Sequence, residues 1–385
     1  MSGALKRDEW KTVRLGDVAT YVNGYAFKPT DWEEDGLPII RIQNLTGNDY
    51  QTNYSSKSHP AKYYVDDGDV LISWSASLGV HKWNRGKALL NQHIFKVVFD
   101  KIDVNRDYFI YAVSYLLEDM ARESHGSTMK HITKPRFDKT AFPLPPLDIQ
   151  RRIADTLDKV TELITLRKTQ LKKLDELVKA RFVEMFGDPV LNPYNWDVVT
   201  IGDIVTDVKY GTSKPAVDGG KYPYLRMNNL TYDGHLDLSD MKYIDIPDNE
   251  IEKCIVRKGD VLFNRTNSIE LVGKTCVFDL DDEMVIAGYI IRVRLNEKLL
   301  PIVLSSYMNS TVLKEQLRNM AKGAVNQANI NAQELQSIKI YLPPLELQEQ
   351  FATFVEQTDK SKSIVQQSLG TLETLKKSLM QEYFG

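Results

Sequence analysis

Leu144–Val160 reads LPPLDIQRRIADTLDKV and Leu342–Thr358 reads LPPLELQEQFATFVEQT, so one motif stands twice in this chain of 385 residues. The shift of 198 residues between the two copies holds without a gap from Leu144–Gly187 to Leu342–Gly385. Both copies end in Phe-Gly. Self-similarity over this length predicts two tandem structural units of the same kind.

Each copy predicts one long helix. No proline follows Pro146 until Pro189, and none follows Pro344. Apolar residues recur about every 3.5 positions, which is typical of a coiled-coil seam, and each helix would be about 55 Å long. The seam of the first helix comprises Ile153, Leu157, Val160, Ile164, Leu171 and Leu174, and that of the second comprises Phe351, Val355, Val365, Leu369 and Leu372. Five polar residues interrupt these seams: Arg167, Arg181, Thr358, Lys362 and Lys376.

The partner of each helix has two interpretations. Each helix could pack only on the module that precedes it, as most amphipathic helices do. A helix this long would overhang such a module, so we favour packing of the two helices on each other. The linker Asp188–Asn195 is short. We therefore predict an antiparallel coiled coil with pseudo-two-fold symmetry that holds two modules at a fixed separation.

The segments before the helices repeat more loosely but in the same order. We predict mixed α/β modules, because short β-rich runs alternate with Gly, Asp and Asn turns. Helices are expected at Asp107–Glu123 and Ile302–Met320 from the spacing of their apolar residues. The matched motifs are Trp10 and LGDV (15–18) with Trp196 and IGDI (201–204), LPIIRIQNL (37–45) with YPYLRMNNL (222–230), and GDVLIS (68–73) with GDVLFN (259–264).

Composition sets the broad class of the protein. The chain is 42% hydrophobic and 26% charged, with a mean hydropathy of −0.34. It has no apolar run long enough for a membrane span and no secretory signal at its start, so we expect a cytoplasmic protein. Two cysteines fit a reducing compartment. The net charge of −3 excludes a uniformly basic coat but allows local basic clefts.

Catalytic motifs are missing from the sequence. It contains no Gly-rich phosphate loop, no dinucleotide-binding fingerprint and no G-x-S-x-G elbow. The six histidines form no H-E-x-x-H motif, and two separate cysteines make no zinc site. We therefore predict a non-enzyme that holds no metal.

Hydrogen-bonding side chains cluster near the expected strand ends and loops of both modules. Arg and Lys pair with guanine, and Asn and Gln pair with adenine, in the major groove of DNA. The candidates in the first module are Arg41, Asn44, Ser73, Trp74, Ser75, Ser77, Lys82, Asn91, Gln92, His93, Lys130, His131 and Lys134. Those in the second are Arg226, Asn228, Asn229, Asn264, Arg265, Thr266, Asn267, Lys274, Asn326, Gln327 and Asn329. Matching positions with different side chains would suit two readers of different sequences.

Together these motifs resemble the specificity subunits of type I restriction-modification systems. The resemblance rests on the Trp-x4-Leu/Ile-Gly-Asp openings, the R-x-x-N-L and G-D-V-L strands, the two L-P-P-L-x-x-Q helix starts and the two Phe-Gly helix ends. It covers nearly the whole chain. Each module also has a Gly-x5-6-Ile loop, GSTMKHI (126–132) in the first and GAVNQANI (323–330) in the second. The second loop is one residue longer, so contacts cannot be transferred between the copies there.

The resemblance implies a division of labour between subunits. Two target recognition domains, residues 1–146 and 196–342, would each read half of a bipartite, asymmetric site in double-stranded DNA. The helices, residues 147–187 and 343–385, would set the spacer and dock two DNA-methyltransferase subunits. S-adenosylmethionine, ATP and Mg would belong to those subunits and to the restriction and translocase subunits, with no cofactor on this chain. The alternatives are a coiled-coil scaffold for proteins, and an anti-restriction decoy that binds partner subunits without reading DNA.

Overall fold

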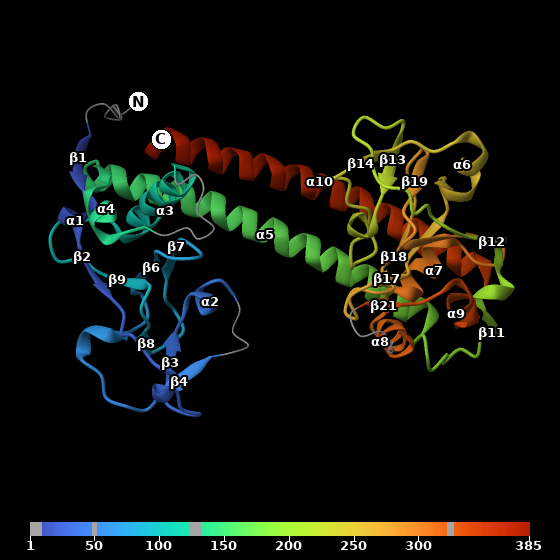
Figure 1. Cartoon of the computed structure of the whole chain (residues 1–385), viewed down its shortest axis with the longest axis horizontal. Helices are drawn as coiled ribbons and strands as arrows, with labels where there is room; N and C mark the ends of the chain where they lie inside the picture. Colours follow the sequence, from blue (N-terminus) through green and yellow to red (C-terminus); the bar gives the residue numbers. More distant parts are fainter. Residues whose placement is uncertain (1–9, 48–51, 124–131, 322–326) are drawn as a thin grey trace. The chain divides into compact units, whose positions relative to one another are not determined.

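The structure is a computed structural model that describes residues 10–47, 52–123, 132–321 and 327–385 (Figure 1). The chain divides into two compact units, one made of residues 1–167 and 368–385 and the other of residues 168–367. Each unit thus contains one module together with part of each long helix. Within the described ranges, no helix combines the length and apolarity needed to cross a membrane.

Two four-stranded sheets form the body of module 1. The antiparallel sheet has the order β2–β9–β6–β7, with bounds Thr20–Asn23, Ile94–Val98, Val70–Ser73 and Gly79–Lys82. The mixed sheet has the order β4–β3–β8–β5, with bounds Asn53–Ser55, Leu37–Ile40, Ala88–Leu90 and Tyr64–Val65, and β3 runs parallel to β8. Strand β1 (Lys11–Arg14) pairs with β10 (Ala141–Leu144), so the two ends of the module meet. The α-helices are α1 (Leu15–Val18), α2 (Ile42–Leu45), α3 (Arg106–Glu123) and α4 (Lys134–Lys139), and the 3-10 helices are η2 (Pro29–Asp31) and η3 (Ala61–Tyr63).

Module 2 repeats the strand order of both four-stranded sheets and the pairing of the module's two ends. Its antiparallel sheet is β12–β20–β16–β18, with bounds Val205–Tyr210, Ile290–Leu295, Val261–Asn264 and Thr275–Val277. Its mixed sheet is β14–β13–β19–β15, with bounds Lys242–Ile244, Tyr222–Leu225, Met284–Ile286 and Ile255–Val256. Strand β11 (Asp197–Thr200) pairs with β22 (Lys339–Leu342), and β17 (Thr266–Asn267) pairs with β21 (Ala328–Asn329). The helices are η4 (Ile201–Asp203), η5 (Met227–Asn229), α6 (Asp248–Cys254), α7 (Pro301–Met308), α8 (Thr311–Met320) and α9 (Ala332–Ser337).

The Gly-Asp-Val motif makes the same turn in both modules. Gly68 has a φ of 89° and Gly259 has a φ of 92°, a region of backbone space that glycine enters without steric cost. Asp69 and Asp260, which follow them, each accept a hydrogen bond of 2.9 Å from the backbone N–H three residues earlier. The glycine therefore permits the turn, the aspartate closes it, and the buried central strand begins at the next residue.

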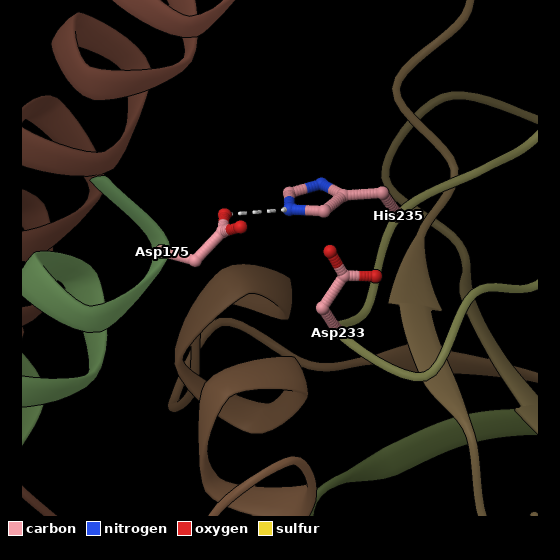
Figure 2. Close-up of side chains that lie close together, drawn as sticks. All are labelled: Asp175, Asp233 and His235. Carbon is pink, nitrogen blue, oxygen red and sulfur yellow. Dashed lines mark ion pairs between the residues drawn. The ribbon is translucent and has the colours of Figure 1, made fainter. Parts of the chain in front are cut away.

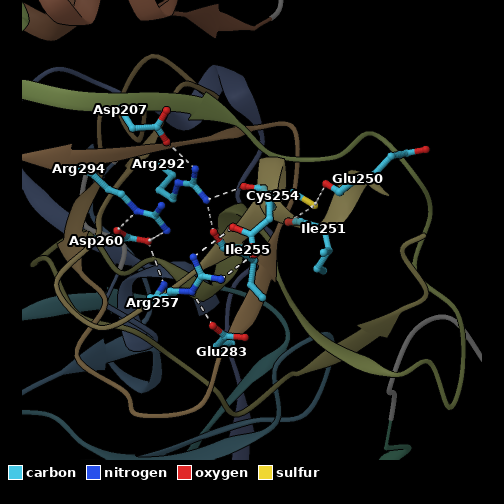
Figure 3. Close-up of polar contacts among 11 residues, drawn as sticks. Asp207, Glu250, Ile251, Cys254, Ile255, Arg257, Asp260, Glu283, Arg292 and Arg294 are labelled. Atoms are coloured by element: carbon cyan, nitrogen blue, oxygen red, sulfur yellow. Dashed lines mark hydrogen bonds and ion pairs between the residues drawn. The ribbon is translucent and has the colours of Figure 1, made fainter. Parts of the chain in front are cut away.

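In module 2 this turn belongs to a network of arginines and carboxylates (Figure 3). Arg292 is 1% exposed, and its guanidinium donates to the carbonyl of Ile255 and, over 2.6 Å, to the carboxylate of Asp207. Arg294 pairs with Asp260 at 2.8 Å. Because leaving a buried guanidinium without acceptors is costly, these contacts favour the observed register of strands β12, β16 and β20.

In the first unit, the beginning of one long helix and the end of the other share one core with module 1. Helix α5 (Leu147–Phe186) contributes Ile153 and Leu157, and helix α10 (Leu345–Phe384) contributes Phe384. The Phe384 ring lies 5.5 Å from the ring of Tyr108 in α3. The last turn of α10 is therefore anchored by burial of aromatic surface.

The second unit contains the complementary helix ends. Phe182 and Phe186 of α5 meet Phe351 of α10 at ring distances of 5.6 Å and 5.3 Å. All three rings belong to the core of module 2, which also includes Val355. Gly187, with a φ of 85°, ends α5, as glycine commonly does after a helix.

The predicted seam residues are all buried or half-buried, including the polar interruptions Thr358 and Lys362. The long helices fall within one or two residues of the predicted spans. The prediction of one helix at Ile302–Met320 is wrong, because α7 and α8 are separate helices. The side chain of Ser310 between them accepts a hydrogen bond from the N–H of Leu313, which starts a new helix.

Candidate nucleic-acid interface

In both modules, one residue directly after strand β6 or β16 is held by the same pair of backbone hydrogen bonds, which we call the frame. In module 1 the N–H of Trp74 donates to the carbonyl of His93 over 3.3 Å. In module 2 the N–H of Arg265 donates to the carbonyl of Tyr289 over 2.9 Å. A second bond completes each frame, from the N–H of Ile132 to Trp74 over 3.0 Å and from that of Ile330 to Arg265 over 2.8 Å. Trp74 and Arg265 are therefore structural equivalents.

Neighbouring glycines allow two chain segments to cross closely beside this frame. A Cβ atom on Gly24 would lie 2.0 Å from the carbonyl oxygen of Asn91, and one on Gly211 would lie 2.2 Å from that of Ile286. No side chain fits at such distances, because real Cβ contacts under 3.0 Å are essentially absent. The frame is thus set by backbone geometry that both modules share.

The side chains mounted on the frame differ between the modules. The Trp74 indole lies 5.0 Å from the His93 ring and donates to the side chain of Asn23 over 3.3 Å. His93 is exposed and holds a φ of 73°, which is uncommon for a residue with a side chain. In module 2 the Arg265 guanidinium lies 4.9 Å from the centre of the Tyr210 ring. One module therefore presents an aromatic pair at this position and the other a cation on a ring.

Two predicted contact residues support the frame rather than facing outward. Asn264 is fully buried, and its amide donates to the carbonyls of Thr266 and Tyr289. Its equivalent, Ser73, is also fully buried, and its hydroxyl donates to the carbonyl of Ser77 over 2.6 Å. A side chain that contacts no solvent cannot reach DNA without rearrangement, so we correct the prediction for both residues to a structural role.

The same correction applies to the asparagine of the R-x-x-N-L motif. The side-chain oxygen of Asn44 accepts from the N–H of Arg41 over 2.9 Å, and that of Asn229 accepts from the N–H of Arg226 over 2.8 Å. Both asparagines are under 5% exposed. Each asparagine closes a short helical turn, so its place in the R-x-x-N-L motif is explained by a structural role and needs no contact with DNA. Two further candidates, Thr266 and Lys274, are also buried.

Several predicted basic residues are paired within their own module. The guanidinium of Arg226 binds the carboxylate of Asp240 at 2.8 Å, and that of Arg41 donates to the side chain of Asn53 over 3.1 Å. Two lysines have carboxylate partners, Lys82 with Asp107 at 3.0 Å and Lys134 with Asp138 at 2.6 Å. Exposed pairs of this kind exchange partners at little cost.

A second polar cluster lies in the second unit (Figure 2). Ligand atoms of Asp175, Asp233 and His235 lie within 4.8 Å of one another, a spacing that would suit a metal ion. However, the ammonium of Lys362 already lies 2.6 Å from Asp175 and 2.7 Å from His235. This cluster therefore has a cation of its own, and it ties the loop that carries His235 to helices α5 and α10.

Comparison with models of known protein families shows which family has this fold. The model of the type I restriction modification DNA specificity domain matches residues 7–176 and again residues 193–374. The chain belongs to this family.

Two curated members of the family match along nearly the whole chain, and a third matches along half of it. The specificity subunit of type I restriction enzyme EcoBI of Escherichia coli is 24% identical, over 98% of this chain and 86% of its own length. That of EcoKI, from Escherichia coli strain K12, is 23% identical over 100% of this chain and 90% of its own length. A putative MjaX specificity subunit of Methanocaldococcus jannaschii is 31% identical over 50% of this chain and 46% of its own length.

Solved structures show the same fold. The type I restriction-modification S subunit from M. genitalium superposes with a TM-score of 0.57 at 14% identity, covering 100% of this chain and 98% of that one. A chain from a study of complex assembly and conformational transition of the type I R-M system superposes with a TM-score of 0.58 at 20% identity, covering 97% of both chains.

Within this specificity-family chain, sequence reasoning missed three residues of the frame, Asn23, Tyr210 and Tyr289. The signal for Tyr289 was present, because aligning HIFKVVF (93–99) with YIIRVRL (289–295) places it opposite His93. The remaining predicted residues are also exposed or half-exposed: Ser75, Ser77, Asn91, Gln92, His93, Asn228, Asn267, Gln327 and Asn329. Lys130, His131 and Asn326 lie outside the described residues.

Proposed function

We propose that this chain is the non-catalytic DNA-recognition subunit of a type I restriction-modification complex, and that each module reads one half of a bipartite, asymmetric site. The observation that carries this proposal is the frame around Trp74 and Arg265. Its backbone is the same in both modules while its outward side chains differ. Residues 1–146 and 196–342 would be the two recognition domains, joined across residues 188–195.

DNA contact is assigned to the outward side chains of the frame and its borders. Arginine and amide side chains can read base edges, while serines and backbone amides suit phosphates. The proposed set comprises Asn23, Trp74, Ser75, Ser77, Asn91, Gln92 and His93 in module 1, and Tyr210, Asn228, Arg265, Asn267, Tyr289, Gln327 and Asn329 in module 2. Lys82, Lys134, Arg41 and Arg226 remain candidates for phosphate contacts, once released from their partners.

The two long helices would form an antiparallel coiled coil that fixes the spacer between the half-sites. Support comes from each unit taken separately, because the start of one helix shares a core with the end of the other in both. Each helix has 40 residues, which corresponds to about 60 Å. The half-site separation would follow from this length.

Partner docking is supported by apolar residues that face solvent away from the seam. Leu166 is 55% exposed, and Ile364, which occupies the same position in the repeat, is 69% exposed. Leu177 and its counterpart Leu375 are 48% and 44% exposed. Equivalent apolar positions on both helices suit two copies of one partner, which we propose is the methyltransferase subunit. S-adenosylmethionine, ATP and Mg would then be bound by the partner subunits.

Electrophoretic DNA binding with the methyltransferase partner tests the proposal. We expect affinity that falls steeply with salt, because lysine and arginine contacts release counterions from phosphates. We also expect a preference for one bipartite sequence over a scrambled competitor. A chain that binds its partner but gives the complex no DNA affinity at low salt would instead be a scaffold or a decoy.

A further inference from the structure

Within the described part of module 2, one arginine has no carboxylate or hydroxyl partner for its guanidinium. Four of the six arginines in residues 196–342 pair with carboxylates: Arg226, Arg257, Arg292 and Arg294. Arg318 donates to the hydroxyl of Tyr232 over 2.8 Å. Among the residues that the structure describes, Arg265 has neither kind of side-chain partner, and the single hydrogen bond of its guanidinium is a 3.5 Å contact with the carbonyl of Gly288.

Arg265 is nevertheless held in position by its surroundings. Its backbone is bonded on both sides, to the carbonyl of Tyr289 and to the N–H of Ile330. Its guanidinium lies 4.9 Å from the centre of the Tyr210 ring, a distance typical of a cation–π contact. The hydroxyl of Tyr210 in turn accepts a hydrogen bond of 2.8 Å from the N–H of Ala332, which fixes the ring.

A held guanidinium without an acidic partner retains donors for a ligand. In DNA, the bidentate acceptor that matches its fork is the O6 and N7 edge of guanine in the major groove. An aromatic ring under the planar guanidinium orients it without consuming its hydrogen-bond donors. A carboxylate in the same place would compete with the base, as Asp240 does at Arg226.

We propose that Arg265 is a specificity-determining residue of module 2 that reads a guanine, with Tyr210 as its positioning residue. This inference rests on the proposed function, and it adds the base and the residue that reads it. The equivalent Trp74 has a single indole N–H, which is already donated to Asn23. Trp74 therefore cannot make the bidentate guanine contact that Arg265 would make from the same position.

The test compares methylated motifs, and competition binding, for the complex carrying the wild-type chain or the Arg265→Gln variant. We expect Arg265→Gln to reduce discrimination for guanine at one base pair of one half-site by about ten- to hundred-fold, the range that a bidentate contact supplies. The other half-site should be unchanged. Tyr210→Leu should weaken the same discrimination without changing which base is preferred, because it loosens the guanidinium without removing it.

Lys258→Gln is the matched control, because Lys258 lies near the other end of strand β16 and is 63% exposed in its side chain. It should leave both half-sites unchanged. An Arg265→Gln complex that keeps full guanine discrimination in both half-sites overturns the inference and leaves the proposed function standing. A wild-type complex with no sequence preference contradicts both. If Arg265→Gln fails to fold, Arg265→Lys decides, since lysine keeps the charge but loses the bidentate fork and should lose most of the discrimination.

Discussion

Phe384→Ala tests whether the end of α10 is held in the core of the first unit. Phe384 is 5% exposed and lies 5.5 Å from Tyr108 and 6.2 Å from Tyr115, ring to ring. Truncating a buried phenylalanine to alanine costs about 3–5 kcal/mol, depending on how far the cavity collapses. The last turn of α10 can relax around the cavity, so we expect about 3 kcal/mol, the low end of this range.

The assay is thermal unfolding of the full chain, measured by calorimetry. In a body of this size each kcal/mol shifts the transition by about 2–4 °C, so the transition of the first unit should fall by about 6–12 °C. Hydrogen exchange should show faster exchange in the last turns of α10. The matched control is Leu375→Ala in the same helix, which removes a side chain that is 44% exposed and should shift the transition little.

Equal, small shifts for Phe384→Ala and Leu375→Ala would refute the reasoning. They would mean that the last turn of α10 is not packed in solution. The contact between the end of α10 and the start of α5 would then be lost as support for the antiparallel coiled coil.

Three further outcomes follow from named contacts. Lys362→Met should lower the free energy of unfolding by about 1–3 kcal/mol in denaturant titrations, because Asp175 and His235 lose their buried cation; unchanged stability would show that the cluster is incidental. Burial lowers the pKa of Lys314 to about 7, from 10.5 in the unfolded chain. Between these two pH values the folded state binds fewer protons than the unfolded state, so the stability of the wild-type chain rises with pH. Lys314→Met should therefore stabilise the chain by about 3 kcal/mol below pH 7 and least near pH 10. A difference in stability that does not change with pH would contradict the claim that burial lowers this pKa. Lengthening both helices by one heptad adds about 10 Å, or about three base pairs, so methylome sequencing should find a longer spacer with both half-sites kept.

The repeat and the long helices were predictable because their physical causes are local in sequence. A gap-free offset and a 3.5-residue apolar period specify two similar helices before any tertiary contact is known. The break at Ser310 was also predictable in principle, because serine is a preferred N-cap residue, the residue just before the first turn of a helix. It was missed because the apolar spacing continues across it.

The contact residues were less predictable, because one residue type serves opposite purposes. Asparagine reads adenine, and it also caps turns, and nothing local in the sequence separates Asn44, a buried cap, from Asn329, which is exposed. Only the tertiary structure shows which side chain has been used up internally. Tyr210 escaped notice for a related reason, because its role depends on Arg265, which is 55 positions away in the chain.

Methylome sequencing of a strain that carries this chain with its methyltransferase partner tests most directly whether the two modules read two different sequences. We expect one new methylated motif in two parts, with different half-sites and a fixed spacer, that is absent when the partner is expressed alone. A contiguous motif, two identical half-sites, or no motif beyond that of the partner would contradict the claim that two modules on one frame read two different sequences.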